Sequence, residues 1–578
     1  MSLFALRFHS WLRCGVVAAL VLAGAVPARA DTAPTGLAPL PALPPVMACA
    51  DLAALRLDGV TDGAVEISAA TVVVAGAAPY CEVRGRIAPA IGFVLRLPTQ
   101  GWTQRYVQTG CGGLCGSARI DPGQGADCVP VRDGNVAIAT TDMGHQGSGT
   151  PAGAWAAGQP QAQIDFAYRG VHATAQLAQA LVARFYGQPA RHRYFIGCSD
   201  GGREALMEAQ RYPQDFDGIV AGAPALNMVV QNSFHHAWNV RANRDASGRY
   251  RLLAGQLPML HAAVLDACDG LDGLVDGLIE DPRRCPFEPR RLLCRDGQDP
   301  AHCLSPEAVA AVQALHDGAR DDQGRYLEVP GAHPWGSERL WTLFVPPTPQ
   351  AAFNFSEQIA AAPFVRYLAH FNQALPAWTV DELRFTAEAF WQTVQTSVYL
   401  SAMDPDLSRF QARGGKLLLW HGWSDEHIAA TNTIAYAQAL RQQMGAAAAD
   451  AFTRLYLLPG VGHCGGGDGP DQVDLLTPVM VWVETGLAPQ ALMTAQVASG
   501  VTTRTRPVYP YPLVARFQGG DPTLAANFAP VDPGPEEPTP DWLGAPLFAS
   551  GYQAQCQARD GRLVCDPPGL PFGTPAPR

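Results

Sequence analysis

The chain has 578 residues, a formal net charge of −11 at pH 7 and only 16% charged residues. This length exceeds what one ordinary hydrophobic core needs, so we expect a large domain with an insertion or a second domain. No basic stripe stands out in the sequence, which argues against nucleic acid as a partner. The mild acidity affects solubility and does not indicate a particular function.

The first 30 residues have the pattern of a secretory signal peptide. Basic residues precede an apolar run over 16–26, and a small-residue cleavage site follows at 28–30. The apolar run is shorter than the roughly 20 residues that a membrane span needs, and no later segment is long and apolar enough. We therefore expect a secreted or periplasmic protein, cleaved before Asp31, with no membrane partner.

The segment that follows predicts an α/β core. Residues 31–47 are rich in Ala and Pro and lead into the fold, and β-type runs then alternate with helical stretches up to about residue 225. Apolar runs such as 93–97 and 106–108 predict strands. Small and apolar residues at helical spacing predict a helix over 163–186.

A candidate nucleophile lies near the end of this first segment. Ser199 stands in Gly197-Cys198-Ser199-Asp200-Gly201, directly after the apolar run 194–196 and before a helical segment over 202–209. A G-x-S-x-G sequence between a strand and a helix is the nucleophile elbow of α/β-hydrolases, in which a tight turn lifts the serine hydroxyl clear of the sheet. The alternative is a glycine-rich turn whose serine only caps a helix.

Two later apolar runs end in the other residues that a serine nucleophile requires. The run 416–420 leads to Asp425, and the run 454–458 leads to His463. Ser…Asp…His is the chain order of this fold. In such an arrangement His463 is the base that takes the serine proton, and Asp425 fixes the imidazole tautomer.

Three neighbouring residues compete for these roles. His427 lies near Asp425 in sequence, but we expect it to begin a helix with the residues after it. Asp468 and Asp471 follow His463 so closely that they cannot easily face its far nitrogen.

With these pieces in place, the chain resembles the tannase and feruloyl esterase family. That family combines a Cys-Ser-Asp-Gly-Gly elbow, an HG-x-x-D segment and a His-Cys pair, which stand here at 198–202, 421–425 and 463–464. The resemblance spans roughly residues 49 to 530. It implies an α/β-hydrolase core with a large inserted lid domain. It also implies a serine carboxylic-ester hydrolase that acts on esters of aromatic acids of the feruloyl, galloyl or terephthaloyl type.

The spacing of the candidate residues suggests how the chain is divided. Far more residues separate Ser199 from Asp425 than the core needs, so we expect core segments over 31–225 and 406–515 with a lid domain over 226–405. Aromatic residues of the lid offer a surface for stacking on an aromatic acyl group, although we expect most of them to form the core of the lid itself. Residues 516–578 form a Pro/Gly-rich tail that we expect to be irregular.

Export permits disulfides among the 14 cysteines. Because Cys198 adjoins Ser199 and Cys464 adjoins His463, contact between the serine and the histidine would bring the two sulfurs within bonding distance. The short spacing of Cys556 and Cys565 also favours a pair. The remaining pairs that the resemblance implies are Cys49–Cys81, Cys268–Cys285 and Cys294–Cys303, besides Cys198–Cys464. After Cys14 in the signal peptide is set aside, Cys111, Cys115 and Cys128 are left, and the sequence does not decide which of them is free or modified.

Acyl transfer also needs N–H donors for the oxyanion of the tetrahedral intermediate. The backbone N–H of Asp200 is one candidate, and the glycine-rich loop 110–116 supplies the other from Gly112 or Gly113, which the sequence does not separate. His421 occupies a family position that faces the pocket. It is a candidate substrate contact, with a structural role at a strand end as the alternative.

The loop 268–278 is a candidate calcium site. Three carboxylates separated by glycines repel one another unless a cation lies between them, and calcium takes such oxygen ligands, although the spacing is not that of an EF-hand. A solvated acidic turn is the alternative. The ligands that the resemblance implies are the side chains of Asp269, Asp272 and Asp276 and the carbonyls of Leu274 and Leu278. We expect this Ca²⁺ to be structural.

Together these observations predict a secreted esterase whose partner is a small aromatic ester, free or attached to a plant polymer. A peptidase or an acyltransferase on the same fold is one alternative. A calcium-dependent carbohydrate-binding protein with a degenerate hydrolase core is another.

Overall fold

The structure is a computed structural model that describes residues 36–147, 152–299, 302–535 and 538–567. The predicted signal peptide, residues 1–30, lies outside the described residues. Across the described ranges, no helix has the length and apolar character that a membrane crossing requires.

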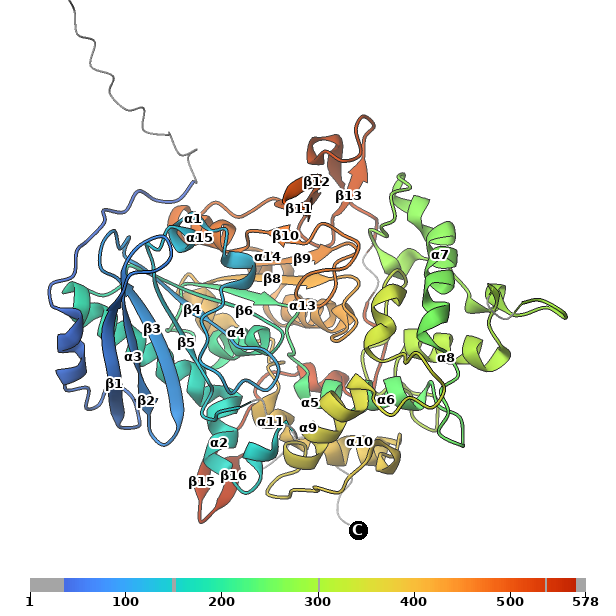
Figure 1. Cartoon of the computed structure of the whole chain (residues 1–578), viewed down its shortest axis with the longest axis horizontal. Helices are drawn as coiled ribbons and strands as arrows, with labels where there is room; N and C mark the ends of the chain where they lie inside the picture. Colours follow the sequence, from blue (N-terminus) through green and yellow to red (C-terminus); the bar gives the residue numbers. More distant parts are fainter. Residues whose placement is uncertain (1–35, 148–151, 300–301, 536–537, 568–578) are drawn as a thin grey trace, which may run out of the picture. The chain divides into compact units, whose positions relative to one another are not determined.

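A nine-stranded mixed sheet forms the centre of the fold, in the order β1-β2-β3-β5-β4-β6-β7-β8-β9 (Figure 1). The strands from β1 through β3 to β5 pair antiparallel, and those from β5 through β4 to β9 pair parallel. The carboxyl ends of the parallel strands therefore meet at one edge, where ligands bind in sheets of this kind. The strands are β1 (Val65–Val73), β2 (Tyr80–Ile87), β3 (Ile91–Pro98), β4 (Arg105–Thr109), β5 (Ala137–Thr141), β6 (His192–Cys198), β7 (Gly218–Gly222), β8 (Lys416–Gly422) and β9 (Thr453–Leu458).

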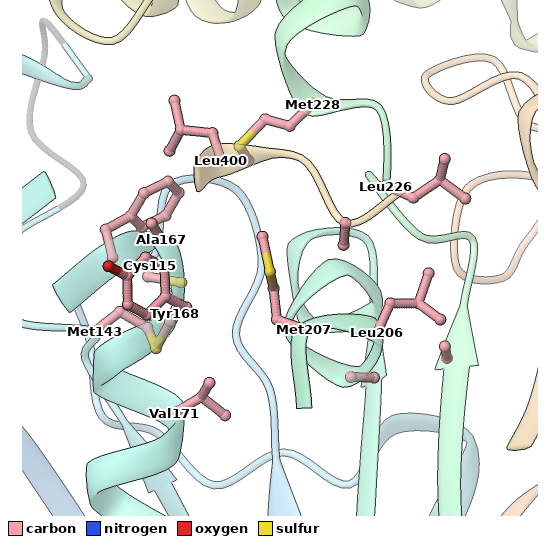
Figure 2. Packing of buried hydrophobic residues seen from close by; sticks show 14 of the residues in the cluster. Cys115, Met143, Ala167, Tyr168, Val171, Leu206, Met207, Leu226, Met228 and Leu400 are labelled. Carbon is pink, nitrogen blue, oxygen red and sulfur yellow. The ribbon is translucent and has the colours of Figure 1, made fainter. Parts of the chain in front are cut away.

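Successive side chains of the strands face two different layers, as the strand period of two requires. In β6, Phe195 packs into the buried cluster that contains Leu206 of α4. Its neighbours Tyr194 and Ile196 pack into a second cluster with Val479 of α15. Figure 2 shows the first cluster between α3, α4 and the loop that holds Cys115. The helices around the sheet are α1 (Val129–Arg132), α2 (Pro160–Ile164), α3 (Gly170–Tyr186), α4 (Asp200–Arg211), α12 (Ser408–Ala412), α13 (Ala430–Met444), α14 (Ala446–Asp450) and α15 (Leu476–Thr485).

The helix predicted over 163–186 is present. It runs from α2 through a π-helical turn, Asp165–Arg169, into α3. Arg169 pairs with Asp165 within this turn at 2.7 Å.

The segment between β7 and β8 is a mainly helical insertion (Figure 1). It has a buried cluster of its own, to which Leu260, Val312 and Trp341 belong. Most aromatic residues of the insertion are buried, whereas Phe353 is 60% exposed. The helices of the insertion are α5 (Met228–Val230), α6 (His236–Arg241), α7 (Leu257–Cys268), α8 (Pro306–Asp317), α9 (Ala362–Tyr367), α10 (Ala387–Thr393) and α11 (Ser397–Leu400).

The C-terminal region is more ordered than its composition predicts. The expectation of an irregular tail after residue 515 is wrong, because that boundary falls inside β13 and two hairpins follow. Most of the described Pro and Gly residues lie outside the strands, while short runs between them pair; Pro530 lies within β14. The strands of this region are β10 (Gln472–Val473), β11 (Leu492–Ala498), β12 (Val501–Val508), β13 (Val514–Phe517), β14 (Phe528–Val531), β15 (Gln555–Arg559) and β16 (Arg562–Asp566).

Six disulfides cross-link the described residues, and they include all five pairs expected from the sequence. Cys556 and Cys565 stand directly opposite each other in the β15–β16 hairpin. The sixth pair, Cys111–Cys115, resolves the choice that the sequence left open. Among the described residues, Cys128 is the free cysteine, and it is buried.

Candidate active site

The elbow predicted at Ser199 is present between β6 and α4. Ser199 has φ 65° and ψ −123°, a strained left-handed conformation that non-glycine residues rarely adopt. The backbone around it is packed too closely for side chains. A Cβ on Gly197 would lie 2.4 Å from the carbonyl oxygen of Gly201, and one on Gly202 would lie 2.4 Å from that of Gly222. The glycines therefore permit the turn that presents the serine.

Ser199, His463 and Asp425 form a continuous hydrogen-bonded chain at the carboxyl edge of the sheet. His463 Nε2 lies 2.9 Å from Ser199 Oγ, and His463 Nδ1 lies 2.8 Å from Asp425 Oδ2. The other oxygen of Asp425 accepts the backbone N–H groups of His427 at 2.9 Å and Ile428 at 2.8 Å. The three predicted residues are thus brought together, with the carboxylate fixed from two sides.

The electrostatics suit a base that is oriented by an ionised carboxylate. Burial alone would raise the pKa of Asp425, but the facing His463 and the hydrogen bonds from His421 and His463 hold that pKa well below its usual range. Burial also opposes the charged form of His463, yet the charges of Asp425 and Glu426 leave its pKa above the ordinary value. Asp425 therefore stays ionised and favours the imidazolium that forms when His463 takes a proton.

Of the two roles predicted for His421, the structure favours the structural one at a strand end over substrate contact. His421 is completely buried at the end of β8. Its Nδ1 lies 2.8 Å from Thr433 Oγ1, and its Nε2 lies 3.1 Å from Asp425 Oδ2 and 2.9 Å from the carbonyl oxygen of Ile428. Both ring nitrogens are thus engaged inside the protein, and the side chain positions Asp425.

The structure corrects the prediction for His427. Helix α13 begins at Ala430, and the N–H groups of His427 and Ile428 before it donate to Asp425. The His427 ring instead packs edge-on against His463, with 4.8 Å between ring centroids, and lies 5.4 Å from the ring of Phe355 in the insertion. Burial and the nearby His463 lower the pKa of His427 to about 3. The uncharged ring of His427, backed by Phe355, therefore forms an aromatic wall beside the candidate base.

The glycine-rich loop predicted to hold an oxyanion donor follows β4 and adjoins the elbow. Its first residue, Gly110, donates its N–H to the carbonyl oxygen of Ile196 in β6 at 3.0 Å. Gly112 lines a cavity of about 520 Å³ together with Cys198 and Cys464. Gly113 does not line that cavity. Asp200, the other candidate donor, is the first residue of α4.

The acidic loop 268–278 connects α7 to the rest of the insertion and is held by its own backbone. Asp269 accepts the N–H groups of Asp276 at 3.1 Å and Gly277 at 2.9 Å, and Asp272 accepts that of Leu274 at 2.9 Å. These bonds fold the carboxylates onto one short segment.

The donors of this loop fit a calcium ion in kind. Asp276 pairs with Arg506, but its Oδ1 is buried and has no hydrogen-bond partner among the described residues. Burial, with the charges of Asp276 and Asp269, raises the pKa of Asp272 to about 6. A cation would supply a partner for that oxygen and relieve the repulsion between the carboxylates.

Comparison with known proteins relates the chain to esterases. Residues 72–531 match the family described as Tannase and feruloyl esterase. The chain is 33% identical over 527 residues to the mono(2-hydroxyethyl) terephthalate hydrolase of Piscinibacter sakaiensis. This match covers 80% of this chain and 87% of that protein. It is 30% identical over 419 residues to a probable feruloyl esterase B-1 of Aspergillus flavus, covering 69% and 75% of the two chains.

A solved esterase structure has a similar fold. The crystal structure of feruloyl esterase B from Aspergillus oryzae superposes with a TM-score of 0.72 and 26% identity, covering 84% of this chain and 99% of that one.

The parallel sheet and the strained elbow that carries Ser199 define an α/β-hydrolase, and the relatives make it a carboxylic ester hydrolase. Within that class, the chain belongs to the tannase and feruloyl esterase family.

Proposed function

We propose that this protein is a secreted serine esterase that hydrolyses esters of aromatic carboxylic acids through an acyl-enzyme. The observation that carries the proposal is the chain of contacts at 2.9 Å and 2.8 Å that joins Ser199 through His463 to Asp425. A serine hydroxyl is a weak nucleophile until a base within hydrogen-bond reach takes its proton. Here the base is in reach and its far nitrogen is fixed.

The reaction then follows from the geometry. Ser199 Oγ attacks the ester carbonyl while its proton passes to His463 Nε2, and the oxyanion is stabilised by the N–H groups of Asp200 and Gly112. His463 returns the proton to the departing alcohol oxygen. A water molecule, deprotonated by the same nitrogen, releases the acid and restores the serine. We favour Gly112 over Gly113 as the second donor because Gly112 shares a cavity with Cys198 and Cys464, the chain neighbours of Ser199 and His463, although Ser199 and His463 do not themselves line it.

Two observations support an aromatic acyl group. The relatives are named as feruloyl esterases and as a hydrolase of a terephthalate monoester. In this chain, the ring of His427 packs against His463, and the ring of Phe355 packs against His427. An aromatic substrate gains from stacking or edge contacts with such rings. Because burial lowers the pKa of His427 to about 3, this wall is polar without being charged. It suits a phenolic ring of the feruloyl or galloyl type.

Secretion and a structural Ca²⁺ complete the proposal. Six disulfides suit an oxidising compartment, in keeping with the signal-peptide pattern of residues 1–30. The ion would be held by Asp269, Asp272, Asp276 and the carbonyls of Leu274 and Leu278. There it would stabilise the inserted segment and take no part in the chemistry.

A panel of substrates tests the proposed function. The purified protein is assayed with methyl ferulate, methyl gallate, a monoester of terephthalic acid, an aliphatic ester and a peptide anilide, with Ser199→Ala as the inactive control. We expect the phenolic esters to be cleaved fastest and the variant to lose about 10⁴-fold or more in kcat. Preferred cleavage of the anilide, or activity in Ser199→Ala within tenfold of the wild type, would overturn the proposal.

A further inference from the structure

The Cys111–Cys115 disulfide lies in the loop that carries the proposed oxyanion donor. It closes the turn around Gly112 and Gly113, and the Cys115 N–H donates to the carbonyl oxygen of Gly112 at 3.1 Å inside it. Cys115 is buried, and Figure 2 shows it beside Met143 and Tyr168. The tip of the loop reaches the surface while its base is fixed in the core.

The base of this loop rests on the side chain of Glu204. Glu204 Oε1 accepts the N–H of Cys111 at 3.3 Å and lies 2.8 Å from Cys111 Sγ and 3.4 Å from Cys115 Sγ. The bonded sulfurs carry no hydrogen, so the two sulfur contacts are packing contacts and the N–H supplies the hydrogen bond. One carboxyl group thus contacts both ends of the disulfide and the backbone between β4 and the donor.

Glu204 belongs to the same helix that begins beside the nucleophile. It is completely buried on α4, and its Oε2 has no hydrogen-bond partner among the described residues. The start of that helix is anchored by Arg203, which pairs with Asp200 at 2.6 Å. Asp200 Oδ2 in turn lies 3.3 Å from Cys115 Sγ. The helix end that presents Ser199 and the donor loop therefore share one buried set of contacts.

The backbones of the two elements also touch. A Cβ on Gly110 would lie 2.5 Å from the Cα of Gly201 and 3.1 Å from Glu204 Oε2. There is no space for the loop to settle closer to α4, and the disulfide prevents its turn from opening. The distance between the loop N–H groups and Ser199 is thus set by Glu204 and by the Cys111–Cys115 bond.

We propose that Glu204 and the Cys111–Cys115 disulfide act as positioning residues. They hold the loop N–H donor at the distance from Ser199 at which it can donate to the oxyanion of the reaction. The inference rests on the proposed esterase function. Oxyanion donors are effective only within about 2.7–3.1 Å of the developing charge. A small displacement of the loop therefore destabilises the transition state more than it destabilises the bound substrate.

The charge state of Glu204 makes a conservative substitution informative. Burial and the adjacent charge of Asp200 raise the pKa of Glu204 well above its ordinary value, which favours the neutral form of the carboxyl group. An amide has the same shape, is also neutral and keeps an oxygen acceptor for the Cys111 N–H. Glu204→Gln therefore preserves the support, whereas Glu204→Leu fills the space and removes the acceptor.

The test separates positioning from folding. Glu204→Gln, Glu204→Leu and the double variant Cys111→Ser/Cys115→Ser are compared with Cys294→Ser/Cys303→Ser, which opens another short disulfide in the insertion. For each folded variant we measure Tm, kcat and KM with the best ester of the panel, and the affinities for an arylboronic acid and for the product acid. The boronate forms a tetrahedral adduct on Ser199 and reports on the oxyanion donors, whereas the product acid reports on ground-state binding.

We expect Glu204→Leu and the Cys111/Cys115 variant to lose about tenfold or more in kcat and a similar factor in boronate affinity, with product affinity within about twofold. Glu204→Gln should stay within about threefold of the wild type, as should the Cys294/Cys303 control. Equal kcat and boronate affinity in all variants would overturn the inference while leaving the esterase intact. A wild-type protein that cleaves no ester would instead overturn the proposed function.

Discussion

Cys198 and Cys464 are joined by a disulfide although 266 positions separate them in the chain. Each is the immediate neighbour of one member of the Ser199–His463 pair, which is itself in contact at 2.9 Å. The covalent bond therefore ties the end of β6 to the loop after β9 across the whole inserted segment. The candidate nucleophile and the candidate base belong to distant parts of the sequence, yet the disulfide prevents the backbones that carry them from separating.

We expect the double variant Cys198→Ala/Cys464→Ala to lose turnover more than substrate affinity. Opening a loop of this length costs about 5 kcal/mol in the chain-entropy model, so the variant should also be less stable. The measurements are kcat, KM and Tm, taken at a temperature at which the variant is fully folded. Cys556→Ala/Cys565→Ala, which opens a peripheral hairpin, serves as the control. Wild-type kcat in the folded Cys198/Cys464 variant would show that the bond stabilises without aligning the pair.

His421 gives a second prediction, because its two possible roles differ in kinetics. As a positioning residue that donates to Asp425 at 3.1 Å, it should affect kcat and leave KM unchanged. We expect His421→Ala to lower kcat by about tenfold or more, and His421→Gln, which keeps an N–H donor, to recover part of the loss. Steady-state kinetics with thermal unfolding as a folding control decide the matter. A raised KM at unchanged kcat would restore the role of substrate contact.

Glu426 should control where activity begins as pH rises. Glu426 Oε2 accepts the backbone N–H of His463 at 3.3 Å, and the charge of Glu426 helps to raise the pKa of the His463 ring. The base must be neutral to take the serine proton, so activity appears as pH rises through that pKa. Glu426→Gln removes a negative charge and lowers the pKa of His463.

The acidic limb of the kcat/KM profile should therefore move to lower pH in Glu426→Gln. Asp468→Asn is the matched control, since that carboxylate pairs with Arg339 at 2.8 Å instead. If the limb of Glu426→Gln moved to higher pH, or coincided with that of the control, Glu426 would not set the charge of the base.

The candidate triad could be predicted from the sequence because its signals are local. A strand, a tight glycine turn and a helix identify Ser199, and the apolar runs before Asp425 and His463 place those residues at the same edge of the sheet. The roles of His421 and His427 could not be predicted. They depend on how the loop after β8 folds back so that its N–H groups reach Asp425, which no local pattern encodes.

The cysteine assignment and the C-terminal hairpins also depend on contacts between remote segments, which a local sequence pattern does not show. Three cysteines were left without assignment, and the choice depends on the burial of Cys128 against Met480 of α15, a contact between remote segments. The hairpins of the tail were missed because short runs between prolines and glycines carry little strand signal on their own. Their pairing, and the Cys556–Cys565 bond across one of them, supplies the stability that the local sequence lacks.

The acidic loop leads to the last prediction, that calcium stabilises the fold and takes no part in the chemistry. The buried Asp276 Oδ1 has no hydrogen-bond partner among the residues that the structure describes, so a cation could bind there. The proposed reaction of Ser199 and His463 does not require a metal ion. An ion that binds only the folded state stabilises it by about 2.7 kcal/mol at a hundredfold excess over Kd. EDTA should therefore lower Tm before it lowers the initial rate in the cold, and Asp272→Ala should reproduce the effect.

The control is Asp322→Ala, which removes an exposed carboxylate elsewhere in the insertion and should not lower Tm. Both quantities are measured on the same EDTA-treated sample. Immediate loss of activity at an unchanged Tm would assign the metal to the chemistry, and an unchanged Tm with unchanged activity would show that the loop binds no ion that matters to the fold.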